Sequence, residues 1–195
     1  MSTIAAATTL LALPVVTLDG GDDVAEVKDV VYDAGGARLL GFTLNKRGWF
    51  RGPMKQVLPW SEVAAVGRDA VMVRDTNALT ERDDAPIDVA EPATNRNVIG
   101  NVVLTDAGVE LGTVADLIVE LDEEATVVGY QLETTAALSG QQHGVLLIPL
   151  PEQISVSGDA LVVPKEVEAF IRDDLTGFGG AVESFRSQLK GAPPS

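Results

Sequence analysis

The chain has 195 residues with 14 Lys and Arg, 29 Asp and Glu, one His and no Cys, so its formal net charge is −15. The lack of Cys excludes disulfides, iron–sulfur clusters and cysteine-ligated zinc, and the single His excludes sites that need several histidines. The acidic balance disfavours non-specific binding to nucleic acid or anionic lipid, which needs a basic surface. Two classes of protein remain possible: a binding or scaffolding protein, and an enzyme that uses carboxylates.

The first 16 residues are apolar enough to be considered as a targeting signal. They contain no Lys or Arg, whereas a secretory signal peptide begins with a basic region. No stretch of the chain reaches the about 18 consecutive apolar residues that a transmembrane helix needs. We therefore expect a leading β-strand here, no transmembrane segment, and a cytoplasmic protein.

Four blocks of sequence recur in the same order in the two halves of the chain. The offset between the two copies grows slowly from 87 to 90 residues along the chain. The paired blocks are 27–33 with 114–120, 40–44 with 128–132, 57–59 with 147–149, and 69–73 with 159–163. Four matches in one order indicate an internal duplication.

Both copies have the pattern of short β-strands. Runs of apolar residues are separated by turn-forming pairs such as Asp-Gly and Gly-Gly, which is typical of strands and hairpins. Strands of this number would risk aggregation through open edges, so closure into a small barrel is favoured. The predicted fold is mainly β, with two small β-barrels in tandem and a C-terminal helical segment.

The predicted organisation has four parts: a first repeat over residues 1–75, a linker over 76–97, a second repeat over 98–164, and a helical segment with a tail over 165–195. Pro86, Pro92 and the acidic pair Asp83-Asp84 indicate the linker. After Pro164, apolar residues recur at helical spacing in two series. These are Val167, Phe170, Ile171 and Leu175, then Phe178, Val182, Phe185 and Leu189. We expect Gly177, Gly179 and Gly180 to separate the two helical pieces.

The second copy contains a nine-residue motif, Gly108-Val109-Glu110-Leu111-Gly112-Thr113-Val114-Ala115-Asp116. It resembles the Gly-x-x-Leu-Gly-x-Val-x-Asp pattern of the PRC-barrel family, the small barrel of the photosynthetic reaction centre H subunit and of a ribosome maturation factor's C-terminal domain. The first copy is degenerate, because Ala25 stands where the second glycine belongs. The resemblance implies two PRC-type barrels that serve as adaptor modules and carry no catalytic residues.

One segment departs from the acidic character of the chain. Residues 46–55 hold four basic residues and no acid, and Arg and Trp often supply the hot spots of protein interfaces. Glycines and a proline suit a protruding loop. The candidate partner-binding residues are Lys46, Arg47, Trp49, Phe50, Arg51, Lys55 and the nearby Trp60. Alternatively, Trp49 and Phe50 fold back to cap the barrel while the cations stay solvated.

The chain shows none of the common catalytic or cofactor-binding motifs. We therefore expect a non-enzymatic adaptor or scaffold without a cofactor, which binds a protein partner or forms a homo-oligomer. Residues 1–90 carry a net charge of −4 and residues 91–195 carry −11. An acidic or phosphorylated protein segment, or the acidic second half of another copy, would therefore suit the basic loop.

Two alternatives stay open. The resemblance also allows a ribosome- or RNA-associated maturation factor, although the negative field of the chain opposes binding to phosphates. Paired carboxylates could instead hold a hard cation in a metal-binding protein. These pairs are Asp22-Asp23, Asp83-Asp84, Asp122-Glu123-Glu124 and Asp173-Asp174.

Overall fold

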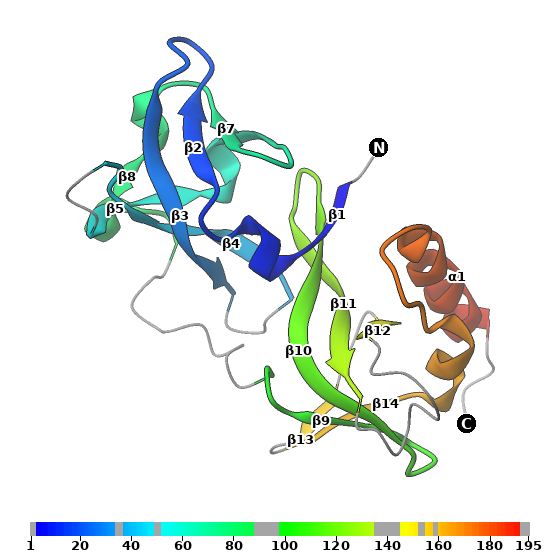
Figure 1. Cartoon of the computed structure of the whole chain (residues 1–195). Helices are drawn as coiled ribbons and strands as arrows, with labels where there is room; N and C mark the ends of the chain where they lie inside the picture. The colour runs from blue at the N-terminus through cyan, green and yellow to red at the C-terminus, as the bar shows by residue number, and fades with distance from the viewer. Residues whose placement is uncertain are drawn as a thin grey trace. The chain divides into compact units, whose positions relative to one another are not determined.

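The computed structural model of the chain describes residues 3–33, 37–48, 52–87, 98–134, 145–151, 155–157 and 160–191. The chain forms two compact units, each built on one β-sheet (Figure 1). We call Ala7–Asn95 with Leu121–Thr126 the first-repeat unit, and Met1–Ala6, Arg96–Glu120 and Val127–Ser195 the second-repeat unit. Each unit therefore includes a short segment from outside its own copy of the repeat.

The first-repeat unit contains a seven-stranded sheet with the order β6-β7-β2-β3-β4-β5-β8. The paired strands run antiparallel, except for β2 and β7, which run parallel. The strands are β2 (Pro14–Thr17), β3 (Asp23–Tyr32), β4 (Leu39–Asn45), β5 (Pro53–Pro59), β6 (Val63–Val66), β7 (Val71–Val73) and β8 (Thr80–Glu81). Short 3-10 helices are η1 (Ala7–Leu10), η2 (Trp60–Glu62), η3 (Thr76–Ala78) and η4 (Arg82–Asp84).

The second-repeat unit contains a sheet with the order β12-β11-β10-β9-β14-β13, and β1 also pairs with β10. Here β9 and β14 are the parallel neighbours. The strands are β1 (Thr3–Ala6), β9 (Val102–Thr105), β10 (Glu110–Leu121), β11 (Thr126–Glu133), β12 (Val145–Pro149), β13 (Ser155–Ser157) and β14 (Ala160–Val163). The helices are η6 (Lys165–Phe170) and α1 (Phe178–Gly191).

The two sheets have the same order of neighbours once each strand is matched with its counterpart in the other copy. The matched pairs are β2 with β9, β3 with β10, β4 with β11, β5 with β12, β6 with β13 and β7 with β14. The register agrees as well, because Gly41 lies opposite Pro59 and Gly129 lies opposite Pro149. The repeated blocks of sequence therefore correspond to a repeated topology, and the prediction of a mainly β fold with a C-terminal helical segment is confirmed.

The segment after β14 differs from the sequence-based prediction. Residues 165–170 form a 3-10 helix, and Arg172 then pairs with Leu147 of β12. The Leu147 N–H donates to the Arg172 carbonyl at 2.7 Å, and the reverse bond is 3.0 Å. This pairing satisfies backbone groups that a longer α-helix would have used. Gly177 precedes α1 with a φ of +75°, whereas Gly179 and Gly180 lie inside the helix.

The core of the second-repeat unit lies beneath α1, against β10, β11 and β12 (Figure 1). The residues that form this cluster are Ala6, Ile118, Val128, Leu147, Phe178 and Val182. Phe178 is completely buried, and burial of such a side chain stabilises a fold by about 1.5–3 kcal/mol. A Cβ atom on Gly129 would lie 2.5 Å from the Phe178 ring, so only glycine lets this ring approach the sheet.

The first-repeat unit has a corresponding core between its strands. Its completely buried side chains include Val15, Phe42, Leu44, Leu58 and Val71. Residues 76–87, which the sequence analysis placed in the linker, contribute η3, β8 and η4, and β8 pairs with β5. Among the described residues, no helix is both long enough and apolar enough to span a bilayer.

We expect Gly129→Ala to lower the free energy of unfolding by about 2–3 kcal/mol, because overpacking forces the Phe178 ring away from the sheet. The matched control is Gly180→Ala, where the added Cβ meets nothing within 4 Å. That change should raise stability by about 0.5–1 kcal/mol, since Ala favours a helix over Gly. Urea unfolding of the three proteins measures both effects, and equal stability of the two variants would contradict the packing argument.

We also expect a pH-dependent contribution from Tyr130, whose pKa burial raises from 10.0 to about 12. The unfolded chain ionises this phenol above pH 10 while the folded chain keeps its proton, so stability falls as pH rises from about 10 to 12, by about 2 kcal/mol at the upper limit. Tyr130→Phe should remove this decline. A Phe is already accommodated at the counterpart position of the other copy, where Phe42 is fully buried. Denaturation midpoints of both proteins between pH 9 and 11.5 test the prediction, and parallel declines would refute it.

Candidate protein-binding site

The predicted basic loop connects β4 and β5. Lys46 follows β4 directly, and its N–H donates to the Gly52 carbonyl at 2.8 Å, which closes the base of the hairpin. Lys46 and Lys55 are both exposed. The remaining candidates of this loop, Trp49, Phe50 and Arg51, lie outside the described residues.

Arg47 is paired with carboxylates of the neighbouring strand β3. Its Nε–H donates to Asp23 Oδ2 at 2.8 Å, and its Nη1–H donates to Glu26 Oε2 at 2.7 Å. The hydrogen bond to Asp23, together with the nearby negative charges, raises the pKa of Arg47 above its ordinary value. Two carboxylates therefore balance this cation locally, while Lys46 lies exposed beside it.

Trp60 lies apart from the basic loop, in η2 at the end of β5. Its half-buried indole packs edge-on against Phe42, with ring centroids 6.1 Å apart and an interplanar angle of 61°. Its Nε1–H donates to the Asp122 carbonyl at 3.1 Å. The indole is thus held in one orientation, and part of it lines a pocket.

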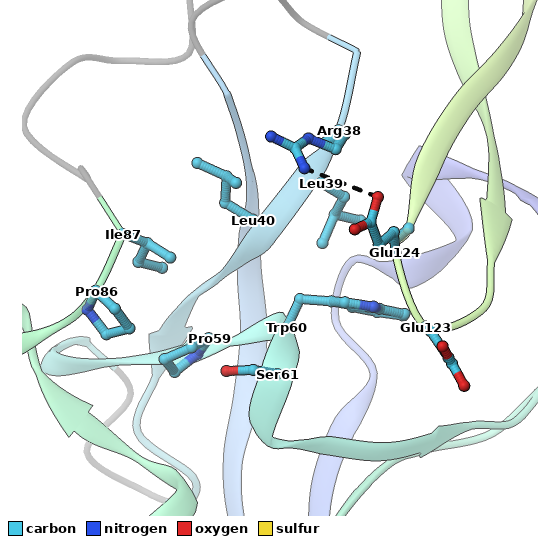
Figure 2. Close-up of a pocket in the computed structure, with 11 residues that line it drawn as sticks. Arg38, Leu39, Leu40, Pro59, Trp60, Ser61, Pro86, Ile87, Glu123 and Glu124 are labelled. Atoms are coloured by element: carbon cyan, nitrogen blue, oxygen red, sulfur yellow. Dashed lines mark ion pairs between the residues drawn. The ribbon is translucent and has the colours of Figure 1, made fainter.

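This pocket, which we call the Leu40 pocket, has a volume of about 290 Å³ and lies within the first-repeat unit (Figure 2). Four segments line it, from the start of β4, the end of β5 with η2, the residues after η4, and the turn 121–126. The lining residues are Arg38, Leu39, Leu40, Pro59, Trp60, Ser61, Pro86, Ile87, Glu123, Glu124 and Ala125. Its volume is at the lower limit of small-molecule sites, which is about 300 Å³.

The lining of the Leu40 pocket is apolar inside and charged at its rim. Leu40, Pro59 and Ile87 contribute apolar side chains to the lining, and Arg38 lies above them in the view of Figure 2. Arg38 Nη1 is 3.8 Å from Glu124 Oε2, and Arg38 Nε is 3.9 Å from Asp33 Oδ2. Exposed pairs of this length contribute little stability, so the rim can rearrange, and the site suits an apolar side chain.

The acidic pairs do not gather around a common centre in the part of the chain that the structure describes. Among those residues, no three His, Asp or Glu side chains are grouped in a way that could hold a metal ion. Carboxylates of three of these groups have other contacts: Asp23 binds Arg47, Asp122 Oδ1 accepts from the Glu124 N–H, and Asp174 Oδ1 accepts from the Thr176 N–H.

Comparison with known proteins assigns the first copy of the repeat to a protein family. Residues 3–79 match the family model described as the PRC-barrel domain. This segment belongs to the PRC-barrel family. The match falls on the copy in which Ala25 replaces the second glycine of the motif, and it supports the resemblance predicted from the sequence. A search of curated proteins finds no match to the chain.

Sequence reasoning identified Trp60 because Trp often supplies interface hot spots and because this residue lies near the basic loop in the sequence, but it did not identify the rest of the Leu40 pocket. Trp60 follows Leu58-Pro59, a block that recurs in the second copy as Ile148-Pro149. Ile87 and Glu124 come from segments far from Trp60 in the sequence, so no local pattern links them.

For the ion pairs of Arg47, we expect Arg47→Gln to lower the free energy of unfolding by at most about 1 kcal/mol, because solvent screens an exposed pair. The loss should shrink in 1 M NaCl, where the Debye length is about 3 Å. Arg68→Gln is the matched control, since the Arg68 side chain is 92% exposed and pairs with its sequence neighbour Asp69. Urea unfolding at two salt concentrations measures the difference, and equal effects of both substitutions would contradict it.

Proposed function

We propose that the protein is a non-enzymatic adaptor that binds protein partners, or a second copy of itself, through its PRC-barrel framework. The Leu40 pocket is the observation that supports this most directly, because a half-buried Trp60 and aliphatic side chains meet there. Trp is among the residues that most often contribute binding energy at interfaces. A chain without Cys suits a reducing compartment, and we place the adaptor in the cytoplasm.

A second feature that supports binding is the exposed cationic pair Lys46 and Lys55 on the β4–β5 hairpin. In a chain with a net charge of −15, such a local positive surface attracts an acidic partner segment and orients its approach. We propose that the sequence-predicted residues of this loop, Trp49, Phe50 and Arg51 included, bind that segment. Arg47 contributes less net charge because Asp23 and Glu26 already balance it.

The adaptor proposal is tested by affinity capture with the immobilised full-length chain, followed by binding measurements with the purified partner. We expect Lys46→Glu with Lys55→Glu to weaken that binding at least tenfold at low salt, since two attractive charges become repulsive. The matched control is Arg68→Glu with Arg82→Glu, which makes the same charge change at exposed positions outside the hairpin. Control binding should equal that of the unmodified chain.

Two outcomes would contradict these proposals separately. Recovery of no protein beyond that bound by an unrelated protein of similar acidity, with no self-association in sedimentation, would overturn the adaptor function. A specific partner that binds both double variants equally would leave the adaptor function standing and overturn the role of the basic loop.

A further inference from the structure

The two units cover the same face of their sheets with different segments. In the second-repeat unit, Arg172 pairs with Leu147 at the outer edge of β12, and Phe178 then packs over Gly129. In the first-repeat unit, Thr80 pairs with Val57 at the outer edge of β5. Ile87 then packs over Gly41, its Cδ1 atom 3.0 Å from the position of a Cβ atom on that glycine. Ile87 is therefore the counterpart of Phe178.

Phe178 is the first residue of a helix, and Ile87 is not. Helix α1 extends from Phe178 across the sheet and brings Val182 onto the same cluster, so that Val128 is completely buried. Within the described residues, the first-repeat unit contains strands and 3-10 helices only. Among those residues no α-helix corresponds to α1, and the Ile87 side chain is smaller than the Phe178 ring.

The consequence is visible at Leu40, which occupies the position of Val128 in the repeat. Leu40 is partly exposed and lines the Leu40 pocket beside Ile87 (Figure 2). The pocket has a volume of about 290 Å³ and carries Leu40, Pro59 and Ile87 in its lining, and an aromatic side chain is a large apolar group that gains from burial at such a surface. The pocket thus lies on the face that Phe178 and α1 cover in the other unit.

We infer that the Leu40 pocket binds an amphipathic helix of a partner protein, which inserts one aromatic side chain over Leu40 and beside Ile87. This inference rests on the proposed adaptor function and names the partner class for one surface. The helix lies on the sheet as α1 lies on the second-repeat sheet, with further apolar residues at helical spacing from its aromatic residue.

The charged side chains at the rim of the pocket favour a particular charge on the residues of that helix next to its aromatic residue. Glu123 and Glu124 are exposed on one side of the pocket, and Arg38, the nearby cation, already faces Asp33 and Glu124. A basic residue near the aromatic anchor therefore pairs with the glutamates, whereas an acidic residue there is repelled. This surface is separate from the basic hairpin loop, so the two can be tested independently.

The probe is a labelled peptide with the sequence of residues 175–191, which includes α1 and carries its aromatic residues, Arg186 and Lys190. In the full chain, the second-repeat face is already covered by the chain's own helix, which is present at high effective concentration. We expect saturable binding of the peptide by fluorescence anisotropy. A peptide with Phe178→Ala should bind at least tenfold more weakly.

Two variants of the full chain place the binding at the pocket. Leu40→Glu should weaken peptide binding at least tenfold, and Ile87→Phe should weaken it because the larger side chain fills the pocket. Leu18→Glu is the matched control, since Leu18 is 60% exposed in the same unit and does not line the pocket. Thermal unfolding establishes whether each variant is folded. If Leu40→Glu does not fold, Ile87→Phe alone still tests whether the peptide binds at the pocket.

Several results would overturn the inference. Failure of the peptide to bind the folded chain at millimolar concentration would overturn it, as would binding of the peptide to Leu40→Glu and Ile87→Phe as tightly as to the unmodified chain. A chain that sediments as a dimer and becomes monomeric with Leu40→Glu would show that a second copy occupies the pocket instead. If any of these results is found while a specific partner is still captured through the basic loop, the adaptor function stands and only the inference of a bound helix fails.

Discussion

The structure depends on a close approach that only glycine permits. In each unit a glycine lies opposite a proline of the neighbouring strand, and an apolar side chain from beyond the barrel strands packs directly over it. At Gly129 that side chain is Phe178, the first residue of α1. A Cβ atom would displace the ring and lift the helix from the sheet, because a close-packed interior leaves no space for adjustment. Gly129 therefore allows Phe178 and α1 to pack against the sheet of the second-repeat unit.

The two units have matching sheets, but different segments pack on them, α1 in one unit and Ile87 in the other. Beneath α1, Val128 and its neighbours form a closed core, whereas Ile87 packs over Gly41, and Leu40 and Trp60 are partly exposed. The charge is divided unequally too, at −4 for residues 1–90 and −11 for residues 91–195. A duplicated domain thus keeps one copy closed around its own helix and presents an apolar pocket on the other.

Much of the fold could be predicted from residue patterns, and less of the candidate site. The repeated blocks became matching strands because alternating apolar residues and turn formers act locally. Trp60 was recognised, but its hydrogen bond to Asp122 was not, since 62 residues separate the two. Nor could the pairing of Arg47 be foreseen. It follows from the register of β3 against β4, where Glu26 lies opposite Asn45.

The sequence by itself determined the strands, the duplication, the PRC-barrel resemblance and the apolar face of α1, because each is a pattern among near neighbours in the chain. The tertiary structure alone decided two other features. Residues 165–175 do not continue as an α-helix, since Arg172 pairs with the edge of β12. The Leu40 pocket exists because sheet pairing brings together four segments that are distant in the sequence, and contacts of that kind leave no periodic signal in any one of them.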